Sequence, residues 1–143
     1  MPETPRLLLV ERPLRPNGYD IDVMGIVSNI VYIRWFEDLR LAFLDTYMPY
    51  EDFLDAGISP VIGRTEVDYK RPITMADRPM GRIWLPELGR ARWRLHFEIS
   101  VGDRIHCAGV QQGYFIDLTR KRPVPAPEPL ATAFASAQAA AKT

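Results

Sequence analysis

The chain has 143 residues, the size of one domain, and we expect a single hydrophobic core. Hydrophobic residues make up 47% and charged residues 25%, average values for globular proteins, which excludes wholesale disorder. Lys plus Arg and Asp plus Glu both number 18, so no net positive charge attracts nucleic acid or an anionic membrane. We therefore predict neither nucleic acid nor a membrane as a partner.

A single cysteine, Cys107, excludes an intrachain disulfide and a Cys-rich zinc site, and it favours a reducing compartment. The longest N-terminal apolar run, Leu7–Val10, is too short for the core of a signal peptide or for a membrane span. We predict a cytoplasmic location. The only histidines, His96 and His106, lack the spacing of metal ligands, so no metal site is expected, and Cys107 is expected to be a packing residue.

The first half of the chain predicts an edge strand and one long helix. Leu7–Arg12 reads as a strand that Pro13 confines to a sheet edge, and Asn17–Ser28 reads as a polar loop. Asn29–Tyr47 contains neither Gly nor Pro, and its apolar residues recur at spacings of three and four. Further apolar residues lie on the other faces of this helix, which predicts that it is buried nearly all round.

The second half predicts strands, since apolar and polar residues alternate over several stretches. Four strands are expected, with the last bent or bulged at its glycines Gly109 and Gly113: Val61–Lys70, Met80–Leu88, Ala91–Val101 and Arg104–Leu118. Because the connections between them are short, we expect an antiparallel meander of four strands.

The last part of the chain changes character. Alternating prolines from Pro123 to Pro129 favour an extended polyproline stretch, and Ala131–Ala141 predicts a short terminal helix with little to bury. We predict a domain over residues 1–122 and a Pro/Ala-rich tail over residues 123–143, part of it mobile.

A long helix preceded by an edge strand and followed by a meander is the layout of the hotdog fold. The predicted class is thus α+β, with a long central helix wrapped by a curved antiparallel sheet.

The loop before the helix holds the candidate reactive groups. Asp20 and Asp22 alternate, Gly25 permits a tight bend, and Ser28 and Asn29 are suited to capping the first helical turn. The start of a helix favours developing negative charge, as an acyl-transfer oxyanion requires, and a carboxylate beside it could attack a carbonyl or activate water. The alternative is that both aspartates only favour the helix start.

A longer string supports the reactive interpretation. Asp20-Ile-Asp22-Val-Met24-Gly25, continued to Trp35-Phe36-Glu37, resembles the opening segment of the 4-hydroxybenzoyl-CoA thioesterase-like family of hotdog acyl-CoA and acyl-ACP thioesterases. Glu66–Asp77 is similar to the strand that follows in that family. The looser likeness extends from Arg6 to about Pro125.

The resemblance implies a thioester hydrolase in which Asp22 is the catalytic carboxylate, as nucleophile or as general base. It implies that backbone N–H groups around Ser28, Asn29 and Ile30 polarise the thioester carbonyl, and that Asn29 shapes the loop or touches the reacting water. Glu37 is expected to be structural, pairing with Arg34 or Arg40.

This sequence departs from the family at three places. Ile26 stands where members often carry His, Ser28 where they often carry Asn, and Arg92-Trp93 where small hydroxyl residues are common. The loss of the histidine favours an alternative, a non-catalytic protein that binds acyl thioesters as a sensor or carrier. A hydratase ranks last, because neither histidine lies in a hydratase-type motif.

The expected partners follow from the same resemblance. The substrate is an acyl-CoA or acyl-ACP, and no cofactor is expected beyond the coenzyme A of the substrate. A single sheet with open edges around one helix predicts a homodimer or a dimer of dimers. The arginines Arg90, Arg92 and Arg94 share one strand face, which is either a solvent-facing side or a contact for CoA phosphates.

Overall fold

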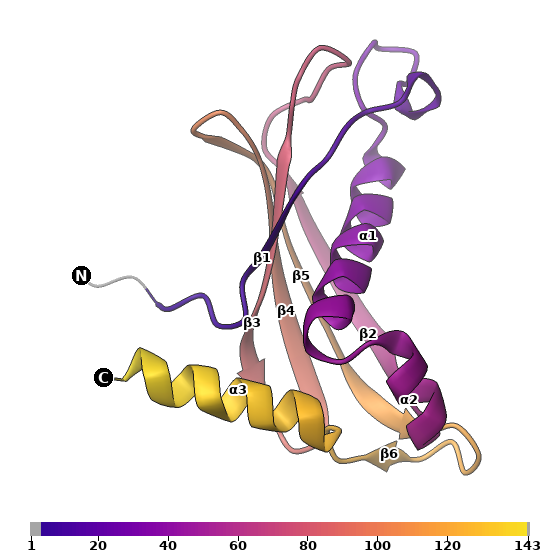
Figure 1. The fold of residues 1–143 in the computed structure, drawn as a ribbon. Helices are drawn as coiled ribbons and strands as arrows, with labels where there is room; N and C mark the ends of the chain where they lie inside the picture. The colour runs from indigo at the N-terminus through magenta and orange to yellow at the C-terminus, as the bar shows by residue number, and fades with distance from the viewer. Residues whose placement is uncertain (1–3, 143) are drawn as a thin grey trace.

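A curved antiparallel sheet carries a long helix along one face (Figure 1). The computed structural model describes residues 4–142. In chain order, the elements are β1 Val10–Pro13, the 3-10 helix η1 Gly18–Asp20, α1 Asn29–Tyr47, α2 Tyr50–Ala56, β2 Ile58–Tyr69, β3 Met80–Leu88, β4 Arg92–Val101, β5 Arg104–Asp117, β6 Pro123–Val124 and α3 Glu128–Ala141. The predicted α+β hotdog class is confirmed.

The strand order is β1-β3-β4-β5-β2, and β6 pairs with β5. β3, β4 and β5 form the expected meander, and β1 lies at the edge to which its proline confines it. The prediction of a four-strand meander is wrong, however, because β2 pairs with β5 and not with β3, its successor in the chain. The residues between β2 and β3 therefore cross from one side of the sheet to the other.

α1 packs on the sheet through one stripe of its surface. Its buried side chains are Val31, Tyr32, Trp35, Phe36, Leu39 and Phe43. Phe36 stacks on Phe97 of β4, with ring centroids 4.3 Å apart. Three other apolar residues of the helix stay exposed, Ile30 at 58%, Ile33 at 43% and Leu41 at 48%. The prediction of a helix buried nearly all round is wrong for the single chain, since the sheet covers only one side.

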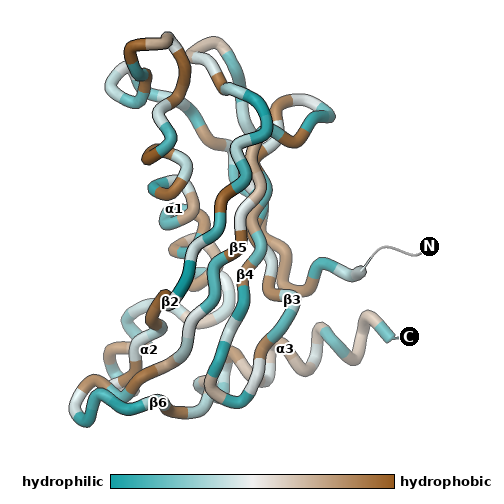
Figure 2. The backbone as a smooth tube through the Cα atoms, turned by 180° about the vertical axis from the view of Figure 1, so that it is seen from behind, coloured by the Kyte–Doolittle hydropathy of each residue, from teal (hydrophilic) through white to brown (hydrophobic). Residues whose placement is uncertain are grey.

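β4 shows the alternation that its sequence predicts. Trp93, Leu95 and Phe97 are buried on the core side, whereas Arg94 and His96 on the other face are half-buried. Figure 2, seen from behind, shows teal segments along β4 between the paler ones. The strand therefore separates a core face under α1 from a polar face.

The C-terminal segment is integrated into the fold, unlike the loosely attached tail that the sequence suggested. β6 pairs with β5, and the N–H of Ala126 donates to the carbonyl of Arg90 over 2.7 Å. α3 crosses the lower end of the sheet in Figure 1, and its Leu130 and Phe134 are buried in the core. The expectation that this helix has little to bury is wrong, because these two side chains share one face of α3. The division at residue 122 stays a prediction.

Candidate active site

The loop before α1 is built around Asp20. This carboxylate is buried, and its Oδ2 accepts the backbone N–H of Asn17 over 2.8 Å, which closes the turn of η1. The carbonyl oxygen of Asp20 accepts the N–H of Ser28 over 2.9 Å. Asp20 thus ties both ends of the loop together, and the interpretation of this aspartate as a structural acid is the one its contacts support.

Asp22 lies at the beginning of a tight turn. Its Oδ1 accepts the N–H of Met24 at 2.8 Å and that of Ile26 at 3.4 Å. The N–H of Asp22 donates to the carbonyl of Ile26, and Gly25 has φ +79, a left-handed conformation that suits glycine. Both side-chain bonds use Oδ1, so the turn orients the carboxylate and leaves Oδ2 outside these bonds.

The first turn of α1 follows directly. Because the N–H of Ser28 is bonded to Asp20, it is not available to a substrate, which corrects its predicted use as a carbonyl-polarising donor. The N–H groups of Asn29 and Ile30 lie in the first turn of α1. The helix has no carbonyl four residues before them that could accept a hydrogen bond. The hydroxyl of Tyr69 donates to the carbonyl of Asn29 over 3.1 Å and anchors the turn to β2.

Two tyrosines behind this turn were not singled out from the sequence. Tyr32 is buried and meets Tyr69 edge to face, with centroids 5.3 Å apart. Burial, reinforced by lesser charge effects from Cys107, Tyr69 and Asp22, raises the pKa of Tyr32 to about 12. The phenol therefore stays protonated at neutral pH. Its sequence spacing predicts only a core position, so the pattern offered no further signal.

The surface around Asp22 is open in the single chain. Asp22 itself is exposed, and so are the apolar side chains of its neighbours Val23, Met24 and Ile30. Asp22 lines neither the cavity between α1, α2 and the sheet nor the one between α1 and β1. An exposed carboxylate in an apolar surround becomes a water-excluded site only when another surface covers it.

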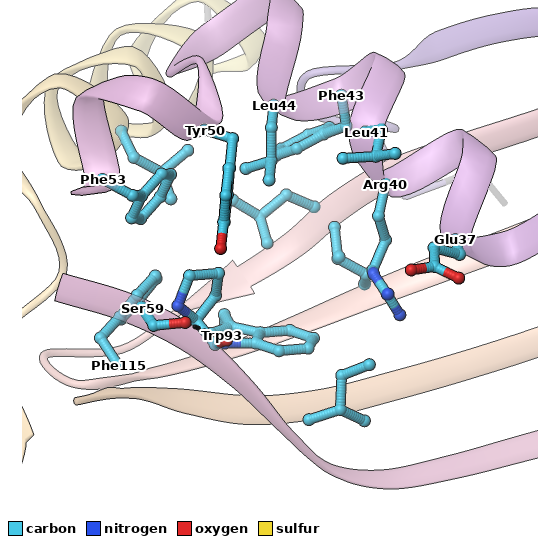
Figure 3. A pocket seen from close by; sticks show the side chains of 15 residues that line it. Glu37, Arg40, Leu41, Phe43, Leu44, Tyr50, Phe53, Ser59, Trp93 and Phe115 are labelled. Carbon is cyan, nitrogen blue, oxygen red and sulfur yellow. Dashed lines mark hydrogen bonds between the residues drawn. The ribbon is translucent and has the colours of Figure 1, made fainter. Parts of the chain in front are cut away.

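The more apolar cavity lies elsewhere, between α1, α2 and the sheet, and has a volume of about 330 Å³ (Figure 3). Its apolar wall includes Phe53, Trp93, Phe115 and the first turn of α3, and its polar lining includes Glu37 and Arg40. The carboxylate that borders this cavity is thus Glu37 and not Asp22, which the sequence did not indicate.

Glu37 does not pair as predicted. Within residues 4–142, neither Arg34 nor Arg40 forms an ion pair with it. Arg40 instead donates through Nη1 to Oε1 of the buried Gln111 over 2.8 Å. Burial lowers the pKa of Arg40, and the charge of Glu37 acts in the opposite direction.

Cys107 and His106 line neither the Asp22 turn nor the apolar cavity. Cys107 is buried, and burial followed by the charge of Asp68 raises the pKa of its thiol to about 12, so it is an inert packing residue at neutral pH. His106 contacts the carbonyl of Pro72 through Nδ1 at 3.0 Å. Residues 4–142 contain no group of three side chains placed to hold a metal ion, and none of their helices is long and apolar enough to span a bilayer.

A long helix packed along one face of a curved antiparallel sheet is the arrangement of hotdog-fold proteins. The chain matches the thioesterase-like superfamily over residues 17–134 and belongs to it. The resemblance to the hotdog thioesterases is thus confirmed at the level of the family.

Individual relatives agree with this assignment. A protein from Aquifex aeolicus (strain VF5), whose name gives it a candidate esterase activity, is 34% identical over 77 residues. The match covers 53% of this chain and 60% of that relative's length.

Two solved structures share the fold. The DHNA-CoA thioesterase from Staphylococcus aureus has a TM-score of 0.84 at 20% identity, covering 94% of this chain and 93% of that one. A 1,4-dihydroxy-2-naphthoyl-CoA thioesterase from Synechocystis has a TM-score of 0.81 at 16% identity, covering 91% and 98%.

Proposed function

We propose that the protein hydrolyses an acyl-CoA thioester to a free acid and CoA, with Asp22 as the catalytic carboxylate. The observation that carries this proposal is the turn that holds Oδ1 of Asp22 on the N–H of Met24, directly before the first turn of α1. Membership in the thioesterase-like superfamily and the names of the structural relatives support the substrate class.

The geometry offers two routes for Asp22. As a nucleophile, Oδ2 attacks the thioester carbon, CoA leaves as a thiolate, and water hydrolyses the resulting mixed anhydride. As a general base, Oδ2 takes a proton from a water molecule that attacks the same carbon. In either route negative charge develops on the carbonyl oxygen, and the N–H groups of Asn29 and Ile30, together with the helix dipole, are suited to stabilise it.

Release of CoA from a panel of thioesters tests this function. We expect purified protein to release free thiol from at least one of short, long, branched and aromatic acyl-CoAs, measured with a colorimetric thiol reagent. Parallel assays with the corresponding acyl-ACP determine the carrier. No thiol release from any member of either series would contradict the proposal.

A second candidate function is favoured by one residue. Ile26 occupies the position at which family members often carry His, and it contacts Oδ1 of Asp22 only through its backbone N–H, at 3.4 Å. A protein of this kind would bind an acyl thioester without hydrolysing it. Saturable binding of an acyl-CoA in calorimetry, with no thiol released over hours, distinguishes this candidate from the enzyme.

We propose that a homodimer, or a dimer of dimers, covers the Asp22 surface. Exposed apolar side chains surround this carboxylate, and β2 ends the sheet order with a long edge, the kind of edge that pairs readily with another chain. Sedimentation at micromolar concentration is expected to give at least twice the mass of one chain. A monomer under these conditions would contradict the assembly and leave Asp22 open to solvent.

A further inference from the structure

Arg40 has an unusual environment for an arginine. Its side chain leaves the middle of α1, passes toward the sheet and is half-buried at the cavity under α2 (Figure 3). Within residues 4–142 no carboxylate pairs with it, and its side-chain hydrogen bond to Gln111 uses only one of the five N–H donors of a guanidinium. A partly desolvated cation with donors to spare favours an anionic ligand.

The cavity supplies room for an apolar group beside this cation. Its volume of about 330 Å³ is at the small end of the range for ligand pockets, which suits a one-ring or two-ring compound and not a whole coenzyme. Phe53, Trp93, Leu95 and Phe115 contribute apolar surface. The hydroxyl of Tyr50 points into the space in Figure 3 and offers a further polar contact.

We propose that this cavity binds a small organic monocarboxylate, with the carboxylate on the Arg40 guanidinium and the apolar body against Phe53 and Trp93. The planar fork of arginine matches a carboxylate, and an aromatic or short aliphatic body fills the apolar walls. Glu37 also borders the cavity and opposes an anion, but its side chain is exposed, where solvent screens its charge.

This site is distinct from the one proposed for hydrolysis. Arg40 is eleven residues beyond Asn29 on α1, which is roughly 16 Å along a helix, and Asp22 does not line the cavity. Binding here therefore does not depend on the identity of the catalytic carboxylate. It is measured without turnover, so its failure and the failure of thioester hydrolysis are separate results.

Binding is tested with matched acids and neutral amides, namely benzoate against benzamide and 1-naphthoate against 1-naphthamide. Quenching of the tryptophan fluorescence that is lost in a Trp93→Phe variant, checked by calorimetry, reports occupancy of the cavity, since Trp35 and Trp84 do not line it. We expect each acid to bind at least about tenfold more tightly than its amide, because a hydrogen bond to a charged group contributes more than a neutral one. Equal affinities, or no acid binding up to millimolar concentration, would overturn the proposal.

Variants locate the site. Arg40→Met is expected to weaken acid binding at least about tenfold while leaving amide binding within about twofold. Arg34→Met, an exposed arginine on the same helix, is the matched control and should leave both unchanged. Because Arg40 also satisfies Gln111, Arg40→Lys provides a second variant that keeps the charge but loses the fork, with intermediate acid affinity expected.

A third variant tests the cavity itself. Leu44→Trp places a large ring in the cavity wall and is expected to abolish binding of acids and amides alike, with Arg40 still present. Circular dichroism confirms that each variant is folded. If Leu44→Trp retained the affinity of the original chain, or if Arg34→Met weakened acids as much as Arg40→Met, the ligand would lie elsewhere and the proposal would be wrong.

Discussion

Replacing Asp22 by asparagine lowers kcat/KM for thioester hydrolysis by at least about 100-fold, if this carboxylate attacks carbon or activates water. The amide keeps an oxygen that accepts the N–H of Met24, so the turn and the fold are retained. The loss should fall on kcat more than on KM, because the negative charge acts mainly in the transition state. Steady-state kinetics with detection of free thiol, together with thermal melts, measures both effects.

Two other carboxylates serve as controls for this variant. Asp55→Asn removes an equivalent charge from the exposed face of α2 and should leave turnover unchanged. Glu37→Gln removes the carboxylate that borders the apolar cavity. Full activity in Asp22→Asn would defeat the assignment. If Glu37→Gln were then the inactive variant, the reaction would have to be placed at the cavity under α2.

Gly113→Ala is expected to destabilise the fold by about 3 kcal/mol, or to lower Tm by about 10 °C. Gly113 lies in β5 between β2 and β4, and a Cβ at this position would collide with the carbonyl oxygen of Val61 and approach the ring of Trp93 to 2.7 Å. The carbonyl belongs to the neighbouring strand, so it cannot move away without disturbing the ladder. Thermal and urea unfolding followed by circular dichroism measures the loss.

Gly63→Ala is the matched control for that substitution. Gly63 lies at the register shift of β2 between Ile62 and Arg64, and the nearest atom to a Cβ there is the carbonyl oxygen of Gln112 at 3.6 Å, an ordinary contact. The change should be neutral or stabilise slightly, by about 0.5 kcal/mol. Equal losses in both variants would show that the effect of Gly113→Ala is a general cost of replacing strand glycines and not a collision.

Local patterns predicted the regular elements closely. α1 was expected over Asn29–Tyr47 and has these bounds, because no Gly or Pro interrupts its spacing. β3 has its predicted bounds, whereas β2 begins three residues earlier than expected. α2 was missed although Pro49 and the left-handed Gly57 flank it, since seven residues are too few for a periodic pattern.

Long-range pairing could not be predicted in the same way. Short connections correctly join β3, β4 and β5, but the partner of β2 depends on which strand edge remains free once those three have paired. An irregularity was expected in β5 at Gly109 and Gly113, but both glycines pair in register. The bulge in β5 falls at His106, and a second one falls on β2 at Gly63, next to the partner of Gly113. Alternation determines which face a residue takes and does not determine which strand it meets.

The candidate site was predictable only in part. Sequence spacing predicted a turn at Asp22 and a helix start at Asn29, and both are present. It could not predict that the N–H of Ser28 would be used by Asp20, because this bond closes across a loop whose path was not known. The cavity beside Glu37 and Arg40 is lined by residues from separate elements, so no local sequence pattern could predict it.

The contribution of Leu130 to the cavity wall has a consequence for specificity. This side chain comes from the first turn of α3, near the end of the chain and well separated in sequence from the Asp22 turn. Substitution of Leu130 by alanine would enlarge the cavity, and substitution by phenylalanine would shrink it. Neither change alters a residue of the Asp22 turn. The size of the ligand that we propose for this cavity could thus be changed through α3, separately from the Asp22 turn.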